Sequence, residues 1–186
     1  DVTQADTHAQ KIRSMGAAGF VYQDGAIYRV FAAAYRDAES LEKVQGQVRT
    51  DGFEATPYIT DQNSVHITLK GDENAVKALE EAIELMNKIP IELSSLSLAF
   101  DKEEIDETEL ESSLKSLQKD LEQAKAALQR INQDSIASIT HVLENDEKHI
   151  STFLQEHDSI SRTNAGELKL LQLRCIADYI QFFERK

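Results

Sequence analysis

The chain has 186 residues, of which 41% are hydrophobic and 28% are charged, and its formal net charge at pH 7 is −13. This composition is typical of a folded protein, and the excess of acidic residues argues against binding to nucleic acid or to an anionic membrane surface. Cys175 is the single cysteine, which excludes an internal disulfide and a cysteine-rich metal site. No run of 18 apolar residues is present that would span a bilayer.

The first 52 residues predict a helix, a hairpin and a second helix. Residues 3–15 are amphipathic, and Gly16 is suited to end that helix. Two β-prone runs, 20–23 and 27–31, flank an Asp-Gly pair, which is a strong hairpin signal. Asp37 is placed to cap the second helix, whose apolar residues are spaced to form one stripe.

Residues 53–98 predict a second set of strands and a helix. Residues 53–59 and 64–70 read as strands, and Asp72 caps a helix that Pro90 is expected to stop, with a last strand from Ile91. The order strand–helix–strand therefore occurs twice. A duplicated βαβ unit predicts an α+β, ferredoxin-like (RNP-like) sheet with both helices on one face.

The second half of the chain is predicted to be helical. Apolar residues between Leu110 and Ile131 are spaced by alternating steps of four and three, which is a heptad seam. Two further amphipathic stretches, 136–158 and 168–183, complete a three-helix region. We therefore expect a domain at 1–100, able to fold alone, and a helical bundle or coiled-coil region at 101–186. The three stripes can bury one another, dock onto the sheet, or serve a dimer through 110–131.

Residues of the first half resemble the SPOR (sporulation-related repeat) domain family. Tyr28-Arg29-Val30-Phe31-Ala32-Ala33-Ala34-Tyr35 is followed by Ala38, Leu41 and the turn Gly52-Phe53-Glu54-Ala55, in the order typical of the family. The run from Val65 to Lys70, leading into the helix after Asp72, fits the same scheme. The resemblance covers residues 18–98, and residues 101–186 resemble no family.

Membership of this family implies non-catalytic binding to the glycan strands of bacterial peptidoglycan, above all strands without stem peptides. It also implies an extracytoplasmic, membrane-anchored protein that serves division or sporulation. Because the sequence begins at Asp1 without a methionine, we expect a processed or truncated product whose anchor lies outside these residues.

Alternation along the strands predicts a set of outward-facing side chains that combine rings with polar groups. Sugars favour such a surface because their C–H faces pack on rings while their hydroxyls bond to polar neighbours. If the C-terminal helices cover this face instead, its aromatic residues are ordinary core. The expected glycan-binding residues are Arg29, Phe31, Tyr35, Thr56, Tyr58, His66 and Thr68.

Two positions depart from the family pattern. Phe31 and Ala33 stand where family members commonly have Gln and Gly. The alternative function is therefore a protein-interaction or oligomerisation module that acts through the heptad helices, with glycan binding lost.

No arrangement of residues indicates an enzyme, a metal site or a cofactor. No nucleophile is associated with a base and an orienting partner in the sequence pattern. His141, His149 and His157 recur every eight residues and are expected on the surface, because rings about 12 Å apart along a helix cannot share one ion. Cys175 lies within an apolar stripe and is expected to be a small core residue.

Overall fold

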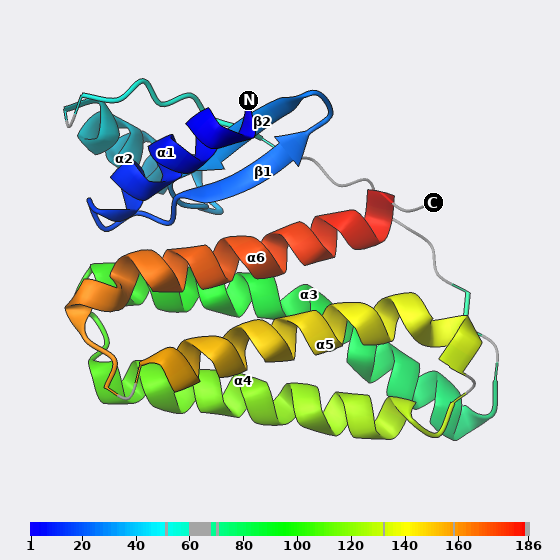
Figure 1. The fold of residues 1–186 in the computed structure, drawn as a ribbon. Coiled ribbons are helices and arrows are strands. Elements are labelled where there is room, and N and C mark those ends of the chain that lie inside the picture. The colour runs from blue at the N-terminus through cyan, green and yellow to red at the C-terminus, as the bar shows by residue number, and fades with distance from the viewer. Residues whose placement is uncertain (51, 60–67, 70, 132, 158, 185–186) are drawn as a thin grey trace.

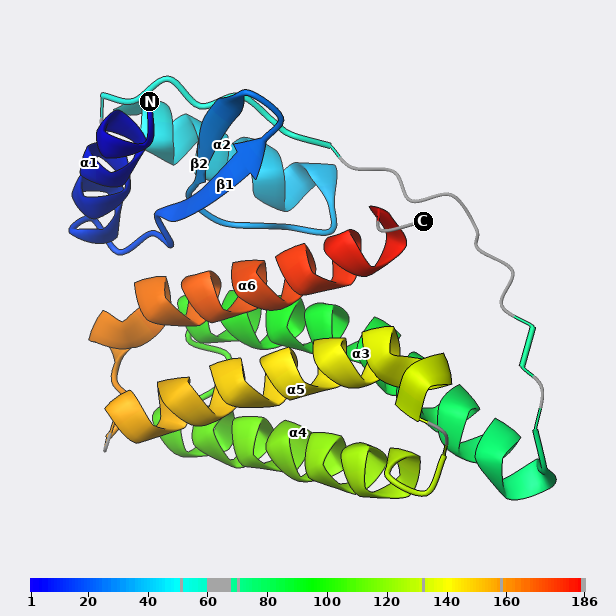
Figure 2. The ribbon, with the colours of Figure 1, turned by 45° about the vertical axis from the view of Figure 1, so that its right-hand side comes forward.

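The computed structural model describes residues 1–50, 52–59, 68–69, 71–131, 133–157 and 159–184. These residues form a mostly helical α+β protein with one two-stranded antiparallel sheet (Figures 1 and 2). In chain order, the elements are α1 (Val2–Arg13), β1 (Phe20–Asp24), β2 (Ile27–Phe31), α2 (Ala38–Thr50), α3 (Glu73–Asp101), α4 (Glu107–Leu128), α5 (Gln133–Glu156), a 3₁₀ turn (Arg162–Asn164) and α6 (Ala165–Glu184).

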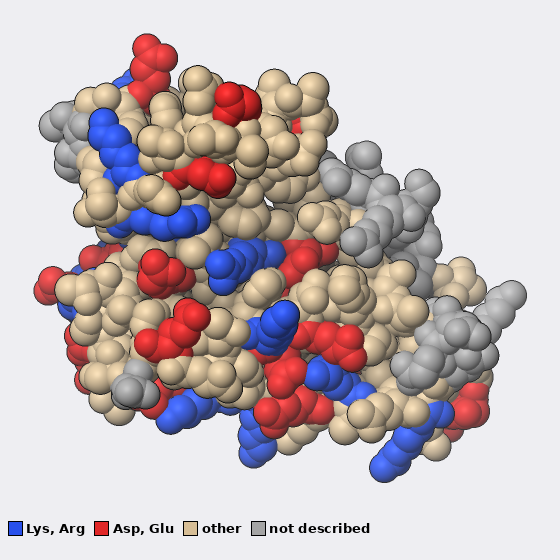
Figure 3. All heavy atoms as spheres, viewed as in Figure 1, with Lys and Arg blue, Asp and Glu red and all other residues tan. Residues whose placement is uncertain are grey.

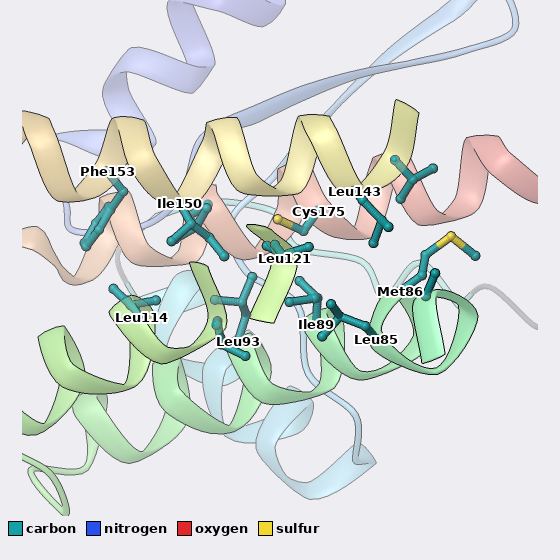
Figure 4. Close-up of a cluster of buried hydrophobic side chains, with 14 of the residues drawn as sticks. Leu85, Met86, Ile89, Leu93, Leu114, Leu121, Leu143, Ile150, Phe153 and Cys175 are labelled. Atoms are coloured by element: carbon teal, nitrogen blue, oxygen red, sulfur yellow. The ribbon is translucent and has the colours of Figure 1, made fainter. Parts of the chain in front are cut away.

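Helices α3 to α6 form a four-helix bundle around the main core. The heptad seam lies inside it, since Leu110, Leu114 and Leu121 are fully buried. Side chains from all four helices point toward one another in Figure 4, among them Ile89, Leu121 and Ile150. The predicted helices of the second half are thus confirmed, and their stripes bury one another within the chain.

Helix α3 corrects the sequence prediction, because it continues through Pro90 to Asp101 where a stop and a strand were expected. Proline removes one backbone hydrogen bond, which weakens a helix interior. The apolar stripe nevertheless continues at helical spacing through Ile89, Leu93 and Phe100, all buried in the bundle core. Burial of this stripe outweighs the lost hydrogen bond.

The first two helices, the hairpin and the extended segment after α2 form a small N-terminal unit, which we call the hairpin unit (residues 2–50 and 52–59). The predicted hairpin is confirmed, and its register pairs Phe20 with Phe31 and Asp24 with Ile27. Gly25 takes the first turn position with φ +59°, a conformation that favours glycine. The predicted cap at Asp37 is confirmed, since its carboxylate accepts a hydrogen bond of 2.7 Å from the Ser40 N–H.

The predicted second βαβ copy is not found among the described residues. Residues 53–59 form no strand, and of the predicted strand at 64–70 only Thr68 and Leu69 lie inside the described residues. Asp72 caps a helix as predicted, but this helix is α3 and belongs to the bundle. Because α3 ends at Asp101 and packs on α4 to α6, the expected division into 1–100 and 101–186 cuts through one hydrophobic core.

The hairpin unit lies against one side of α6, as both ribbon views show. Ala18, Leu170 and Leu173 form a separate small cluster there, against which Phe20 and Phe31 pack. Within the described residues, no helix combines the length and apolar character needed to cross a membrane.

Candidate functional site

Three of the expected glycan-binding residues lie together on the hairpin unit. The ring centroids of Phe31 and Tyr58 are 5.4 Å apart, and the Arg29 guanidinium carbon lies 4.8 Å from the Tyr58 centroid. The Tyr22 ring is 6.1 Å from that of Phe31. We call Tyr22, Arg29, Phe31 and Tyr58 the hairpin cluster.

The register of the hairpin explains how this cluster forms. Tyr22 is paired with Arg29 across the two strands, so both side chains lie on one face of the sheet, together with Phe31. Asp24, on the same face, binds the Nε of Arg29 at 2.7 Å. Tyr58 reaches this face from the extended segment that follows α2.

The hairpin cluster combines the accessible ring of Tyr58 with the Arg29 guanidinium, which Asp24 holds in place. Tyr58 is 43% exposed, and the Arg29 side chain is 38% exposed. A sugar ring can pack its C–H face on Tyr58, while guanidinium N–H groups not used by Asp24 donate to hydroxyl or carboxylate oxygens. In the face shown in Figure 3, acidic and basic side chains are interspersed over the bundle, and the hairpin unit shows a larger uncharged area.

The other expected site residues lie elsewhere or outside the described residues. Tyr35 is half-buried, and burial, assisted by the Asp101 carboxylate, raises the pKa of its phenol to about 12. It lines a hollow of about 130 Å³ with residues of α3 and α6. Thr56 and Thr68 are exposed, whereas His66 lies outside the described residues.

The face of the hairpin that bears the aromatic rings is partly accessible and partly covered. Phe31 contacts Tyr58 on the accessible side and is also packed against the α6 cluster. The C-terminal helices therefore cover part of the face that alternation predicted to be free. The hairpin cluster remains accessible at Arg29 and Tyr58.

A second polar group, which the sequence reasoning missed, lies between α5 and α6. Asp146 is 1% exposed, and among the described residues its carboxylate oxygens meet no hydrogen-bond donor apart from the Cys175 thiol. Burial raises the pKa of Asp146 to about 7; the Cys175 thiol opposes this rise and the Asp178 carboxylate adds to it. The sequence does contain a signal for the burial of Asp146, because this residue stands three positions after Leu143 and four before Ile150, on the apolar face of the helix.

Asp178 is the centre of a hydrogen-bonded network beside Asp146. Its carboxylate contacts His149 Nε2 at 3.0 Å and accepts a hydrogen bond of 3.2 Å from the Asn145 amide. His149 was expected on the surface but is half-buried, whereas His141 is exposed. The network borders a hollow of only about 50 Å³, lined in part by His141 and Asn145.

The chemistry available to this network is limited. Cys175 is fully buried, and burial raises the pKa of its thiol well above the usual value, so it stays protonated and unreactive near neutral pH. Among the described residues, no three His, Cys, Asp or Glu side chains are grouped so that they could hold a metal ion. The hairpin cluster is therefore the stronger candidate for ligand binding.

Comparisons with models of protein families, with curated proteins and with solved structures gave no match for this chain.

Proposed function

We propose that this protein binds glycan strands of bacterial peptidoglycan without catalysis, through the hairpin cluster. The observation that carries the proposal is the Tyr58 ring, which is 43% exposed and contacts both Phe31 and Arg29. A ring fixed in this way loses little conformational entropy when a sugar packs on it. The residues from Tyr28 to Ala55 that resemble SPOR domains favour peptidoglycan glycan over other polysaccharides.

The same resemblance assigns the protein a place and a process. In this proposal it acts outside the cytoplasmic membrane, anchored in its full-length form, and serves division or sporulation. No nucleic acid is a ligand, since the net charge of −13 opposes phosphate backbones.

The alternative function, recruitment of a partner by the heptad helix, gains no support from the packing. The apolar seam of α4 is buried inside the bundle, so 110–131 presents mainly its polar side to other molecules. We therefore retain glycan binding as the single proposal.

The test is sedimentation of the protein with purified glycan strands that carry or lack stem peptides. Tyr58→Ala removes the accessible ring and is expected to lower the affinity about tenfold, the equivalent of ~1.4 kcal/mol. Tyr28→Ala is the matched control, because Tyr28 is 38% exposed and alternates to the opposite face of β2. It is expected to bind like the wild type.

Two results would contradict the proposal. One is the absence of sedimentation with any glycan preparation at protein concentrations far above those typical of carbohydrate-binding modules. The other is equal loss of binding in the Tyr58→Ala and Tyr28→Ala variants, which would indicate a non-specific effect of removing a tyrosine.

A further inference from the structure

Helix α6 covers part of the face that carries the proposed binding residues. Phe20 and Phe31 stand opposite each other across the two strands, and both pack against Ala18, Leu170 and Leu173. Leu170 and Leu173 are 6% and 5% exposed, so the hairpin unit shields them almost completely from water. A glycan strand that followed the ring-bearing face past Phe31 would collide with α6.

Tyr35 is obstructed in the same way. It was expected beside Phe31 on the binding face, but it lies where the hairpin unit meets the bundle. Pro90 and Ile91 of α3, with Gln172 and Ile176 of α6, line the hollow that it borders. The bundle thus blocks the access of a ligand to Tyr35 and to one side of Phe31, while Arg29 and Tyr58 stay accessible.

Specific polar contacts hold the hairpin unit in this position. The buried Gln172 side chain donates a hydrogen bond of 3.0 Å to the Ala34 carbonyl. Lys169, which pairs with Asp101 of α3 at 2.9 Å, donates to the Gly16 carbonyl at 3.4 Å. The contacts join one defined surface of α6 to the hairpin unit.

Gly166 makes this close approach possible. A Cβ atom at this position would lie 3.0 Å from the Ala17 carbonyl oxygen and 3.1 Å from the Gly16 carbonyl carbon. Both atoms are backbone, so a Cβ alone requires the Gly16–Ala17 segment to shift by a few tenths of an ångström, and a larger side chain requires a larger shift. Gly166 is the second residue of α6, and glycine is a poor helix former compared with alanine or leucine.

The covering contact is separable from the bundle core. Leu170 and Leu173 belong to the small cluster under the hairpin, whereas the neighbouring Leu168 and Leu171 belong to the main core. One covalent connection, the chain between α2 and α3, joins the hairpin unit to the bundle. The two can therefore part without unfolding α3 to α6.

We propose that α6 is an autoinhibitory cover for the hairpin unit, and that release of this contact exposes a longer glycan-binding face that includes Phe31 and Tyr35. This inference rests on the proposed glycan binding. In the docked state a glycan reaches only Arg29 and Tyr58, and in the released state it contacts the whole face. If the docked state outweighs the released one by about ten to one, permanent release raises the apparent affinity about tenfold.

The test uses two variants of the full chain that break the contact by different means. Leu173→Glu places a charge in the small cluster and leaves the main core untouched. Gly166→Leu separates the backbones by steric overlap while favouring the helix itself. Gln181→Glu, at an exposed position of α6, is the control for added charge on that helix.

Affinity for glycan strands without stem peptides is measured by sedimentation, and helical content by circular dichroism. Leu173→Glu and Gly166→Leu are expected to keep the helical signal and bind about tenfold more tightly than the wild type, with Gln181→Glu unchanged. Proteolytic cleavage within the hairpin unit should accelerate in the same two variants, which reports release independently of binding.

The outcomes separate the two proposals. If the wild type binds glycan and neither released variant binds more tightly, the autoinhibitory cover is wrong and the proposed function stands. If the wild type and both variants fail to bind, both proposals are overturned. If only one variant folds, its affinity relative to the wild type decides in the same way.

Discussion

The bundle and the hairpin unit differ in how much of each is buried in a core of its own. Among the described residues, the main core contains 22 buried side chains, and every one of them comes from α3 to α6 or the connections between them. The cluster under the hairpin has three, and two of these belong to α6. The hairpin unit therefore has a small core of its own, in which Ala5 and Ala9 of α1 are buried, and α6 supplies its other buried apolar contacts. No described residue of the hairpin unit belongs to the main core.

This comparison has a consequence for function. A surface that is loosely held can expose residues to a ligand, while a closely packed core keeps its geometry. The accessible ring of Tyr58 lies on the hairpin unit, and the polar residues buried in the bundle are enclosed. If the proposed function is correct, stability and glycan binding thus depend on different parts of one chain.

The largest effect is expected from cutting the chain. A fragment of residues 1–101 includes α3 without its partners, so its apolar stripe is exposed and the fragment should show no cooperative unfolding. A fragment of residues 68–186 keeps the whole main core and should unfold cooperatively on heating. Thermal melting followed by circular dichroism distinguishes the two, and a cooperative transition in 1–101 would show that the division near residue 100 is correct after all.

Truncation of a leucine is expected to lower the free energy of unfolding more in the bundle than in the hairpin unit. Leu121→Ala opens a cavity in the bundle and should lower the free energy of unfolding by about 2–5 kcal/mol. Leu41→Ala, at a half-buried position of α2, should lower it by about 1 kcal/mol or less. Urea denaturation measures both, and equal losses would mean that the hairpin unit contributes as much to cooperative stability as the bundle.

The pH dependence of bundle stability should report the buried carboxyl at Asp146. Its pKa in the folded protein is about 7, above the ordinary 3.8, because burial disfavours the charged form. The protonated Asp146 carboxyl therefore stabilises the fold fully at a pH below its pKa in the unfolded chain, and this stabilisation is lost as pH rises through its pKa in the folded protein. The wild type should melt at a higher temperature at pH 5 than at pH 8. Asp146→Asn should remove most of that difference.

Glu144→Gln is the matched control for this experiment, since Glu144 is exposed on the same helix. It removes one carboxylate without touching the core, so its melting temperature should follow pH as the wild type does. Two results would contradict the assignment: a wild-type melting temperature that does not change between pH 5 and pH 8, or one that falls with pH by the same amount in Asp146→Asn.

A smaller effect is expected at the end of the bundle near Arg162. Its guanidinium donates to the Phe100 carbonyl and, at 2.8 Å, to the Ile105 carbonyl, and it lies 4.1 Å from the Phe100 ring centroid. Arg162→Lys keeps the charge but not the planar fork, and should lower the free energy of unfolding by about 1–2 kcal/mol. Urea denaturation at two salt concentrations checks this, and recovery of full stability by lysine would show that charge alone matters.

The sequence by itself determined the local elements and their ends. Alternating steps of four and three predicted α4, and Asp37 and Asp72 were correctly expected to cap helices because a carboxylate satisfies free N–H groups locally. The Asp-Gly pair predicted the hairpin, and alternation placed Arg29 and Phe31 on one face of β2. Tyr58 contacts both, although the strand from which its position was predicted does not form. Each of these inferences depends on residues a few positions apart, or on the two-residue alternation of a strand.

Only the tertiary structure decided which stripe packs against which. An apolar stripe requires burial but does not specify its partner, so α3 was expected under a sheet and is found in the bundle. The continuation of α3 beyond Pro90 was not predicted for the same reason. The proline is a local signal that ends helices, and here core contacts with helices distant in the chain outweigh it. The covering of Phe31 by α6 and the burial of Asp146 against Cys175 also join residues far apart in the chain, and no local pattern encodes such contacts.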